Sequence, residues 1–418
     1  MTRRFALLTV LGATALCGGG GTAGASVVRP ERDASLHVTG LGPEPYGSAV
    51  SGVGDVNGDG RPDLAVMQER PFVAPSVLVV FGRPGRGTLD AGRDPGAAGF
   101  TIADPPDQVP FGDRGGLIEA TFVAASVGPA GDVNGDGLGD VLVGHAGVGN
   151  SLRRGSGSAF VVFGKRDTAP VRLDRLGTGG FRVDGPRAFS ALGFQHAPLG
   201  DLDGDGLGDV VLGADGAAFV VFGSRSPDTV DLRTPGRRAA AYFSPLNYPD
   251  STNEHGVAAA GDANGDGRGD FVLGVGGHAE IGDGVREART WVIFSKPGIA
   301  PTDLRRPGSW GYEITGTRMN GLDLGTAAPA GDVNRDGRGD VVLNNGTRSW
   351  VVPGRASTQP VDVRTAPDVL EIKGRRTQAY GDVQVAGVGD VNGDGRADVA
   401  IGDPTRSARA PTATAAGR

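Results

Sequence analysis

The sequence predicts an all-β protein built from repeated units, and three observations support that prediction. Glycine accounts for 75 of the 418 residues, against a usual share of about 7%. One acidic pattern, D-x-[DN]-x-D-G-x-x-D followed by an apolar run, occurs six times. After the amino terminus, no apolar pattern with the 3.6-residue period of a helix is sustained. Short Val- and Phe-rich segments bounded by Gly and Pro instead favour strands joined by tight turns.

The amino terminus has the three parts of a secretory signal peptide. Arg3 and Arg4 form a charged region, residues 5–16 form an apolar stretch, and residues 23–25 (AGA) fit a cleavage site between small residues. The apolar stretch is too short for a convincing transmembrane helix. We therefore expect residues 1–25 to be removed and the protein to be secreted.

Cysteine usage fits export without disulfides. The single cysteine, Cys17, lies in the signal segment, and Leu16 precedes it where a lipoprotein signal has a small residue, so lipid anchoring is disfavoured. Bound ions could replace the missing disulfides as crosslinks. Residues 405–418 are rich in Pro, Ala and Thr and are predicted to form a disordered tail. No later segment is apolar enough to span a bilayer, so we expect a released protein. We also expect the protein to be monomeric.

The acidic pattern sets the repeat length. Its first aspartate lies at positions 55, 132, 201, 262, 332 and 390, so the copies are 58 to 77 residues apart. That spacing fits a four-stranded unit. Short strands such as 36–40 (LHVTG) precede the loops, and apolar strands such as 77–82 (VLVVFG) follow them. Each unit is predicted to run from a first strand through the acidic hairpin loop to a second, a third and a return strand.

Four-stranded sheets need neighbours to cover both faces, and stacking them around an axis provides this cover. We predict a β-propeller of four-stranded blades over residues 26–404, with six blades favoured and seven as the alternative. A stacked solenoid is the less suitable rival. The sixth unit lacks a third strand after residues 398–402. The segment SVVRP at 26–30 could pair there and close the ring.

The acidic loops carry the donors of a calcium site. Positions 1, 3, 5 and 9 have carboxylate or amide side chains, position 7 can offer its main-chain carbonyl, and glycine at position 6 permits a tight turn. Turn formation alone does not explain three aspartates kept in six copies, because without a cation these charges repel one another. We predict about six structural Ca²⁺ ions. The predicted ligands are Asp55, Asn57, Asp59, Arg61, Asp63; Asp132, Asn134, Asp136, Leu138, Asp140; Asp201, Asp203, Asp205, Leu207, Asp209; Asp262, Asn264, Asp266, Arg268, Asp270; Asp332, Asn334, Asp336, Arg338, Asp340; and Asp390, Asn392, Asp394, Arg396, Asp398.

An EF-hand is the first rival for these loops. The EF-hand loop ends with a bidentate Glu at position 12. In the six copies position 12 is Val66, Val143, Leu212, Leu273, Leu343 or Ile401. The residues that follow have the composition of a strand, so EF-hand and dockerin assignments are disfavoured.

The loops and their flanks resemble the FG-GAP repeat, which builds the β-propeller head of integrin α subunits and is similar to VCBS-like repeats of secreted bacterial proteins. Tyr46-Gly47 and Tyr380-Gly381 match the aromatic-Gly pair of that repeat, and residues 402–404 (GDP) match its Gly-Ala-Pro. The resemblance covers about 36–404. Integrin heads have seven blades, whereas six units are counted here.

The resemblance implies a binding or adhesion module for an extracellular protein or polysaccharide. It also implies calcium loops on one rim and partner-binding loops on the other. The segments expected on that other rim are 103–121, 144–157, 244–254 and 274–288. Tolerated insertions explain their variable length equally well.

A secreted carbohydrate-active enzyme, a polysaccharide lyase or hydrolase on a propeller scaffold, is the alternative function. A cell-wall spacer without a specific ligand is the third. The sequence has no H-E-x-x-H or G-x-S-x-G motif, and a polar loop explains the grouping of Asp250, Ser251 and His255 more simply than catalysis does. The net charge of −7 disfavours nucleic acid as a partner.

Two RGD tripeptides, at 268–270 and 338–340, are not predicted to be adhesive motifs. Their aspartates are position 9 of two acidic loops, and a carboxylate bound to its own ion cannot reach a receptor. Asn345 fits a glycosylation sequon.

Overall fold

The computed structural model describes residues 8–10, 13–14, 36–39, 50–70, 73–83, 87–90, 99–103, 125–145, 155–188, 190–214, 217–243, 255–275, 289–298, 302–304, 310–316, 326–345, 348–373 and 384–402. Every regular element in these residues is a strand, apart from one 3₁₀ turn, η1 (Leu173–Arg175). The predicted all-β class is therefore confirmed. Among the described residues, no helix is long and apolar enough to cross a membrane.

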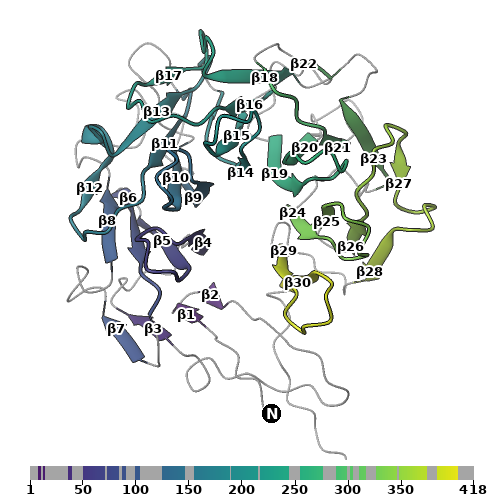
Figure 1. The fold of residues 1–418 in the computed structure, drawn as a ribbon, viewed down its shortest axis with the longest axis horizontal. Helices are drawn as coiled ribbons and strands as arrows, with labels where there is room; N and C mark the ends of the chain where they lie inside the picture. The colour runs from purple at the N-terminus through teal and green to yellow at the C-terminus, as the bar shows by residue number, and fades with distance from the viewer. Residues whose placement is uncertain are drawn as a thin grey trace, which may run out of the picture.

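The sheets follow one another in chain order around a central space, which is the arrangement of a β-propeller (Figure 1). Each acidic loop belongs to its own sheet. The first three of these sheets contain β4 (Val50–Gly54), β5 (Asp63–Arg70), β6 (Val73–Val80), β8 (Gly99–Ala103) and β12 (Val171–Arg172); β9 (Ala125–Gly131), β10 (Asp140–His145), β11 (Ser158–Val162), β13 (Gly180–Asp184) and β17 (Val230–Asp231); and β14 (His196–Gly200), β15 (Asp209–Ala214), β16 (Ala217–Val221), β18 (Ala239–Phe243) and β22 (Thr302–Asp303).

The remaining sheets are less uniform. They contain β19 (His255–Gly261), β20 (Asp270–Val275), β21 (Arg289–Ile293), β23 (Gly311–Thr315) and β27 (Val361–Asp362); β24 (Thr326–Gly331), β25 (Asp340–Asn344), β26 (Arg348–Val352) and β28 (Leu370–Lys373); β29 (Gln384–Gly389) and β30 (Asp398–Gly402); and β2 (Ala13–Thr14), β1 (Leu8–Val10), β3 (Leu36–Thr39) and β7 (Gly87–Asp90).

The acidic hairpin is the innermost part of each sheet. β4 and β5 pair antiparallel on either side of the first loop, and β4 lies against β9 of the next sheet. The short strand expected ahead of the second loop, in residues 100–104 (FTIAD), forms β8 (Gly99–Ala103) and is instead the outer strand of the first sheet. It pairs with β6 because the chain returns along the same sheet before it enters the next unit.

A fifth strand, which the sequence analysis missed, extends four of the sheets. It is a short segment of the following unit that pairs parallel with the outer strand, as β12 does with β8 and β27 with β23. A buried side chain follows each of these two, Leu173 after β12 and Val363 after β27. The fifth strand therefore links each of these four sheets to the next unit at the outer edge of the sheet.

The core lies between adjacent sheets. Every residue of β10 and of β15 is buried, because each of these strands has a neighbouring sheet on both faces. One cluster joins Leu142 and Val161 of the second sheet to Leu212 and Phe219 of the third. Such strands are continuous apolar runs because neither face meets water.

The sheet of β1, β2, β3 and β7 bears on ring closure. β7 pairs parallel with β3 in the manner of the fifth strands elsewhere, so β3 occupies the place of an outer strand. β1, which falls in the predicted signal peptide, pairs parallel with β3, whereas the third and outer strands of the other sheets pair antiparallel. The segment 26–35 lies outside the described residues, and its role in closure stays a prediction.

Candidate metal centre

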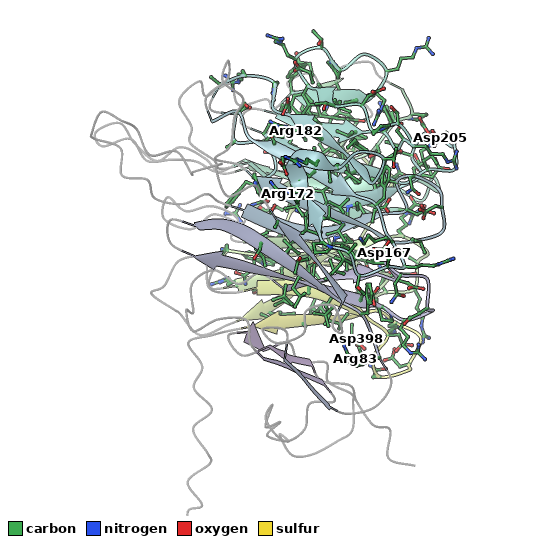
Figure 2. The ribbon with its side chains drawn as sticks, turned by 90° about the vertical axis from the view of Figure 1, so that its left-hand side faces the viewer. Arg83, Asp167, Arg172, Arg182, Asp205 and Asp398 are labelled. Atoms are coloured by element: carbon green, nitrogen blue, oxygen red, sulfur yellow. The ribbon has the colours of Figure 1, made fainter. Side chains whose placement is uncertain are left out.

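The six acidic loops join the innermost strand of a sheet to the second strand. Figure 2 shows Asp205 of the third loop and Asp398 of the sixth on the same side of the molecule. The predicted position in a hairpin is confirmed, since β4 ends at Gly54 and β5 begins at Asp63. Neighbouring loops also contact one another, as the N–H of Gly208 does with the carbonyl of Asp132, so the acidic loops gather on one rim of the ring.

The carboxylate at position 1 folds each loop around itself. In the first loop, Oδ1 of Asp55 accepts hydrogen bonds from the N–H groups of Gly58 and Asp59 at 2.8 and 3.0 Å, and Oδ2 accepts one from Gly60 at 2.7 Å. Gly60 has a φ of 82°, in the left-handed region that favours glycine. The local sequence alone thus closes the loop.

Positions 3 and 5 point their oxygens along the same turn. Asn57 Oδ1 accepts from the N–H of Asp59, and Asp59 Oδ1 accepts from the N–H of Arg61, both at 2.9 Å. The second Asp59 oxygen, Oδ2, lies 3.6 Å from Arg61 Nη1. These side chains present oxygen atoms, the donors that calcium prefers.

The carboxylate at position 9 forms the buried base of the loop. Asp140 is fully buried; its Oδ2 accepts from the N–H of Val133 at 2.7 Å and its Oδ1 from the N–H of Gly164 at 2.7 Å. Position 9 thereby ties the acidic loop to the end of the third strand. The corresponding partners at the end of the third strand are Gly82, Gly223, Ser295 and Gly354.

Those partners are functional residues that the sequence analysis did not single out. The glycine that ends the segments VLVVFG and AFVVFG was the available signal, because a residue without a side chain recurs at a strand end. Only the folded chain shows that the N–H of this glycine reaches an aspartate 14 to 24 residues away.

Burial makes these base carboxylates electrostatically unusual. Desolvation raises the pKa of Asp140, Asp209 and Asp270 to about 7, although the backbone hydrogen bonds oppose the rise. The other aspartates of each loop add to it by repulsion. A bound divalent cation would remove this penalty, so the donor set fits a metal ion.

The third loop brings three carboxylates together most closely. Single oxygens of Asp201, Asp203 and Asp209 all lie within 4.8 Å of one another, and among the described residues no other group of three acidic, His or Cys side chains meets that spacing. In the second loop Asn134 Nδ2 donates to Asp136 Oδ2 at 3.0 Å, and Asn134 Oδ1 accepts from the N–H of Asp136 at 2.8 Å, as Asn57 Oδ1 does from Asp59 in the first loop.

From the second loop to the sixth, side chains at position 7 contact the neighbouring unit. Arg61 and Arg338 also lie 3.6 and 3.8 Å from the position-5 aspartate of their own loop. Leu138 and Leu207 are buried, and Arg268 Nε donates to the carbonyl of Leu202 at 3.3 Å. Only the main-chain carbonyl at position 7 can therefore serve as a ligand.

The two RGD aspartates, Asp270 and Asp340, are fully buried, and backbone N–H groups contact both oxygens of each. This supports the prediction that these tripeptides are not adhesive motifs. Asn345 of the sequon is also buried. The side chains of 250–255 lie outside the described residues.

Comparison with known proteins gives two findings. A family model for the FG-GAP repeat matches residues 46–67 and 383–418, which contain the first and last acidic loops. The chain is 28% identical over 237 residues to integrin alpha pat-2 from Caenorhabditis briggsae. That match covers 50% of this chain and 18% of the integrin, so the chain corresponds to less than a fifth of that relative's length.

Proposed function

The chain is an FG-GAP repeat protein of the integrin α type, and from this premise we propose that it is a secreted, calcium-stabilised β-propeller that binds an extracellular partner. The relationship to an integrin α chain favours a binding module over an enzyme. The partner, a protein or a polysaccharide, would meet the rim opposite the acidic loops, where loops on a rigid scaffold can vary.

The observation that carries the calcium proposal is the buried base of the loops. Asp209 is fully buried beside Asp201 and Asp203, and the second and fourth loops repeat the burial with Asp140 and Asp270. Carboxylates that lie close together and are removed from water cost folding free energy when no cation neutralises them. We infer about six structural ions, one in each loop, that crosslink the hairpins.

Thermal unfolding of residues 26–418 with calcium and with EDTA, together with elemental analysis, tests this proposal. We expect five or six bound calcium ions and a large fall in melting temperature in EDTA, because each ion at 100 times its dissociation constant adds about 2.7 kcal/mol. Asp205→Asn should lose one ion. Asp228→Asn, which changes an exposed aspartate outside the loops, is the matched control. If no calcium is bound and EDTA causes no shift in melting temperature, the loops are turns without a metal-binding role.

We further propose that the ring has six blades and that β3 and β7 complete the sheet of β29 and β30. Residues 26–30 would supply the missing third strand once the signal peptide has been removed. Deleting 26–35 should then lower the melting temperature sharply. An unchanged melting temperature would favour a different closure.

A ligand screen separates binding from the enzyme alternative. Calcium-loaded protein would be tested for binding to wall polysaccharides and extracellular matrix proteins, and the polysaccharides would be analysed for cleavage. Saturable binding without cleavage supports the proposal, whereas cleavage that Asp250→Asn or His255→Ala abolishes would support the enzyme.

A further inference from the structure

Within the described residues, an arginine from a neighbouring unit contacts each of the six acidic loops. Five of these contacts are hydrogen bonds to a loop carbonyl: Arg225 Nη2 to Gly135 at 3.4 Å, Arg268 Nε to Leu202 at 3.3 Å, Arg338 Nε to Asn264 at 3.4 Å, Arg396 Nη1 to Val333 at 3.1 Å and Arg335 Nε to Gly395 at 3.0 Å. At the first loop, Arg166 covers Gly58, where a methyl group would lie 3.2 Å from its Nε.

These arginines come from different places in the repeat. Arg268, Arg338 and Arg396 occupy position 7 of the following loop. Arg166 and Arg225 instead stand two residues after the glycine that bonds to position 9. A guanidinium therefore reaches the preceding loop from either of two sequence positions.

Arginine occupies one of these two positions, and a different residue occupies the other. Where the following loop has leucine at position 7, as at Leu207, arginine stands at the second position, as at Arg225. Where position 7 is Arg338, the second position is Ala356. A guanidinium therefore contacts the preceding loop in both cases, although it comes from a different position of the repeat.

The sixth loop obtains its arginine from the opposite direction. Arg335 occupies position 4 of the fifth loop, which is glycine in the other five. It has a φ of 66°, which is unfavourable for a residue with a side chain. Its guanidinium lies over Gly395 of the sixth loop.

We infer that these arginines set the calcium affinity of the loops: each stabilises the ion-free loop and lowers its affinity for Ca²⁺. The inference rests on the calcium binding proposed above. Bound Ca²⁺ adds two positive charges to a loop of three or four acidic side chains, so the loop is more negative without the ion than with it. The guanidinium is therefore attracted more strongly to the ion-free loop.

The hydrogen bonds to the carbonyls do not reverse this sign. They involve main-chain carbonyls, whose charge is the same with and without the ion, and only an interaction that differs between the two states shifts the equilibrium. The Coulomb difference remains, and it weakens as salt screens it because the arginines are partly exposed. The arginines would thus hold the acidic rim together at low calcium and tune the loops to the weak binding typical of extracellular modules.

Arg225 offers the clearest test, because its described hydrogen bond is to the second loop. Calcium would be titrated calorimetrically into wild type, Arg225→Met and Arg225→Lys at low salt and in 0.5 M NaCl. We expect Arg225→Met to tighten one site about three- to tenfold at low salt, with a smaller effect at high salt. Arg225→Lys should change little, and Arg225→Met should lower the melting temperature in EDTA.

Two controls locate the effect. Arg175→Met removes an exposed arginine whose described ion pair is with Asp174, and it should leave calcium affinity unchanged. In an Asp136→Asn background, which disables the second loop, Arg225→Met should no longer change the titration.

The outcomes separate the two proposals. Weaker or unchanged calcium binding in Arg225→Met, or a tightening that persists in the Asp136→Asn background, would overturn the arginine inference alone. A wild-type protein that binds no calcium would overturn both.

Discussion

The junctions between the first three loops differ from those between the later ones. At the early junctions Leu138 and Leu207 pack on Gly58 and Gly135 of the preceding loop and are buried. At a later junction Arg338 covers Gly265, and its side chain remains 37% exposed. An arginine contacts the preceding loop at both kinds of junction, but at the early ones a buried leucine at position 7 packs there as well, whereas at the later one position 7 is the arginine itself.

The backbone between the loops is the same in both regions. The N–H at position 8 donates to the carbonyl at position 1 of the preceding loop, as Gly208 does to Asp132 at 2.6 Å and Gly339 to Asp262 at 2.8 Å. Main-chain bonds therefore set the geometry of the rim, while the residue at position 7 decides whether that position contributes by apolar packing or by charge.

The largest effect should come from a change of pH in calcium-free protein. This experiment tests a feature that the early and the later loops share, the buried aspartate at position 9. The pKa of Asp140, Asp209 and Asp270 rises from 3.8 to about 7 on folding because of burial. The folded state then binds more protons, so the stability these groups contribute is complete below about pH 4 and is lost as pH rises through 7. Urea unfolding in EDTA measures this fall.

Calcium should reverse that dependence, because the ion requires ionised carboxylates. Asp140→Asn should remove its share of the pH effect in EDTA. Constant stability in EDTA between pH 4 and 8 would show that the buried carboxylates do not titrate as inferred.

Truncation of leucine should be the next largest effect. Leu207→Ala removes a buried side chain and should cost about 2–4 kcal/mol in urea unfolding with saturating calcium. The matched Arg338→Ala at a later junction should cost less than about 1 kcal/mol, because its side chain is partly exposed. Equal costs would remove the distinction between the regions.

A methyl group at position 8 should have a smaller effect. A Cβ at Gly208 would lie 3.0 Å from the carbonyl oxygen of Asp132, so Gly208→Ala should cost about 1–2 kcal/mol. The sixth loop already carries Ala397 there, and its N–H donates to Asp332 at 3.0 Å. Ala397→Gly should therefore change the unfolding free energy by less than about 1 kcal/mol.

Salt should produce the smallest effect. Raising NaCl from 0.05 to 0.5 M should reduce the contribution of Arg338 and leave that of Leu207 unchanged, because only the charge is screened. The unfolding free energies of Leu207→Ala and Arg338→Met, each compared with wild type at the two salt concentrations, measure this effect. A salt-dependent cost for Leu207→Ala would contradict the assignment of its role to packing.

Much of the fold could be predicted from the sequence. The strands, the acidic hairpins and the all-β class follow from local composition and from the spacing of the repeats. The fifth strands could not be predicted, because Val171–Arg172 pairs with a strand of the preceding unit and has only two residues of its own. Two residues carry too little pattern to stand out in a sequence.

The candidate site divides in the same way, according to distance along the chain. The shape of each acidic loop follows from local sequence, because in the first loop Asp55 bonds to N–H groups three to five residues away. How deeply Asp140 is buried, and which arginine contacts which loop, depend on the packing of neighbouring sheets. Arg225 meets Gly135 across 90 residues, and contacts at that separation exist only once neighbouring sheets have packed.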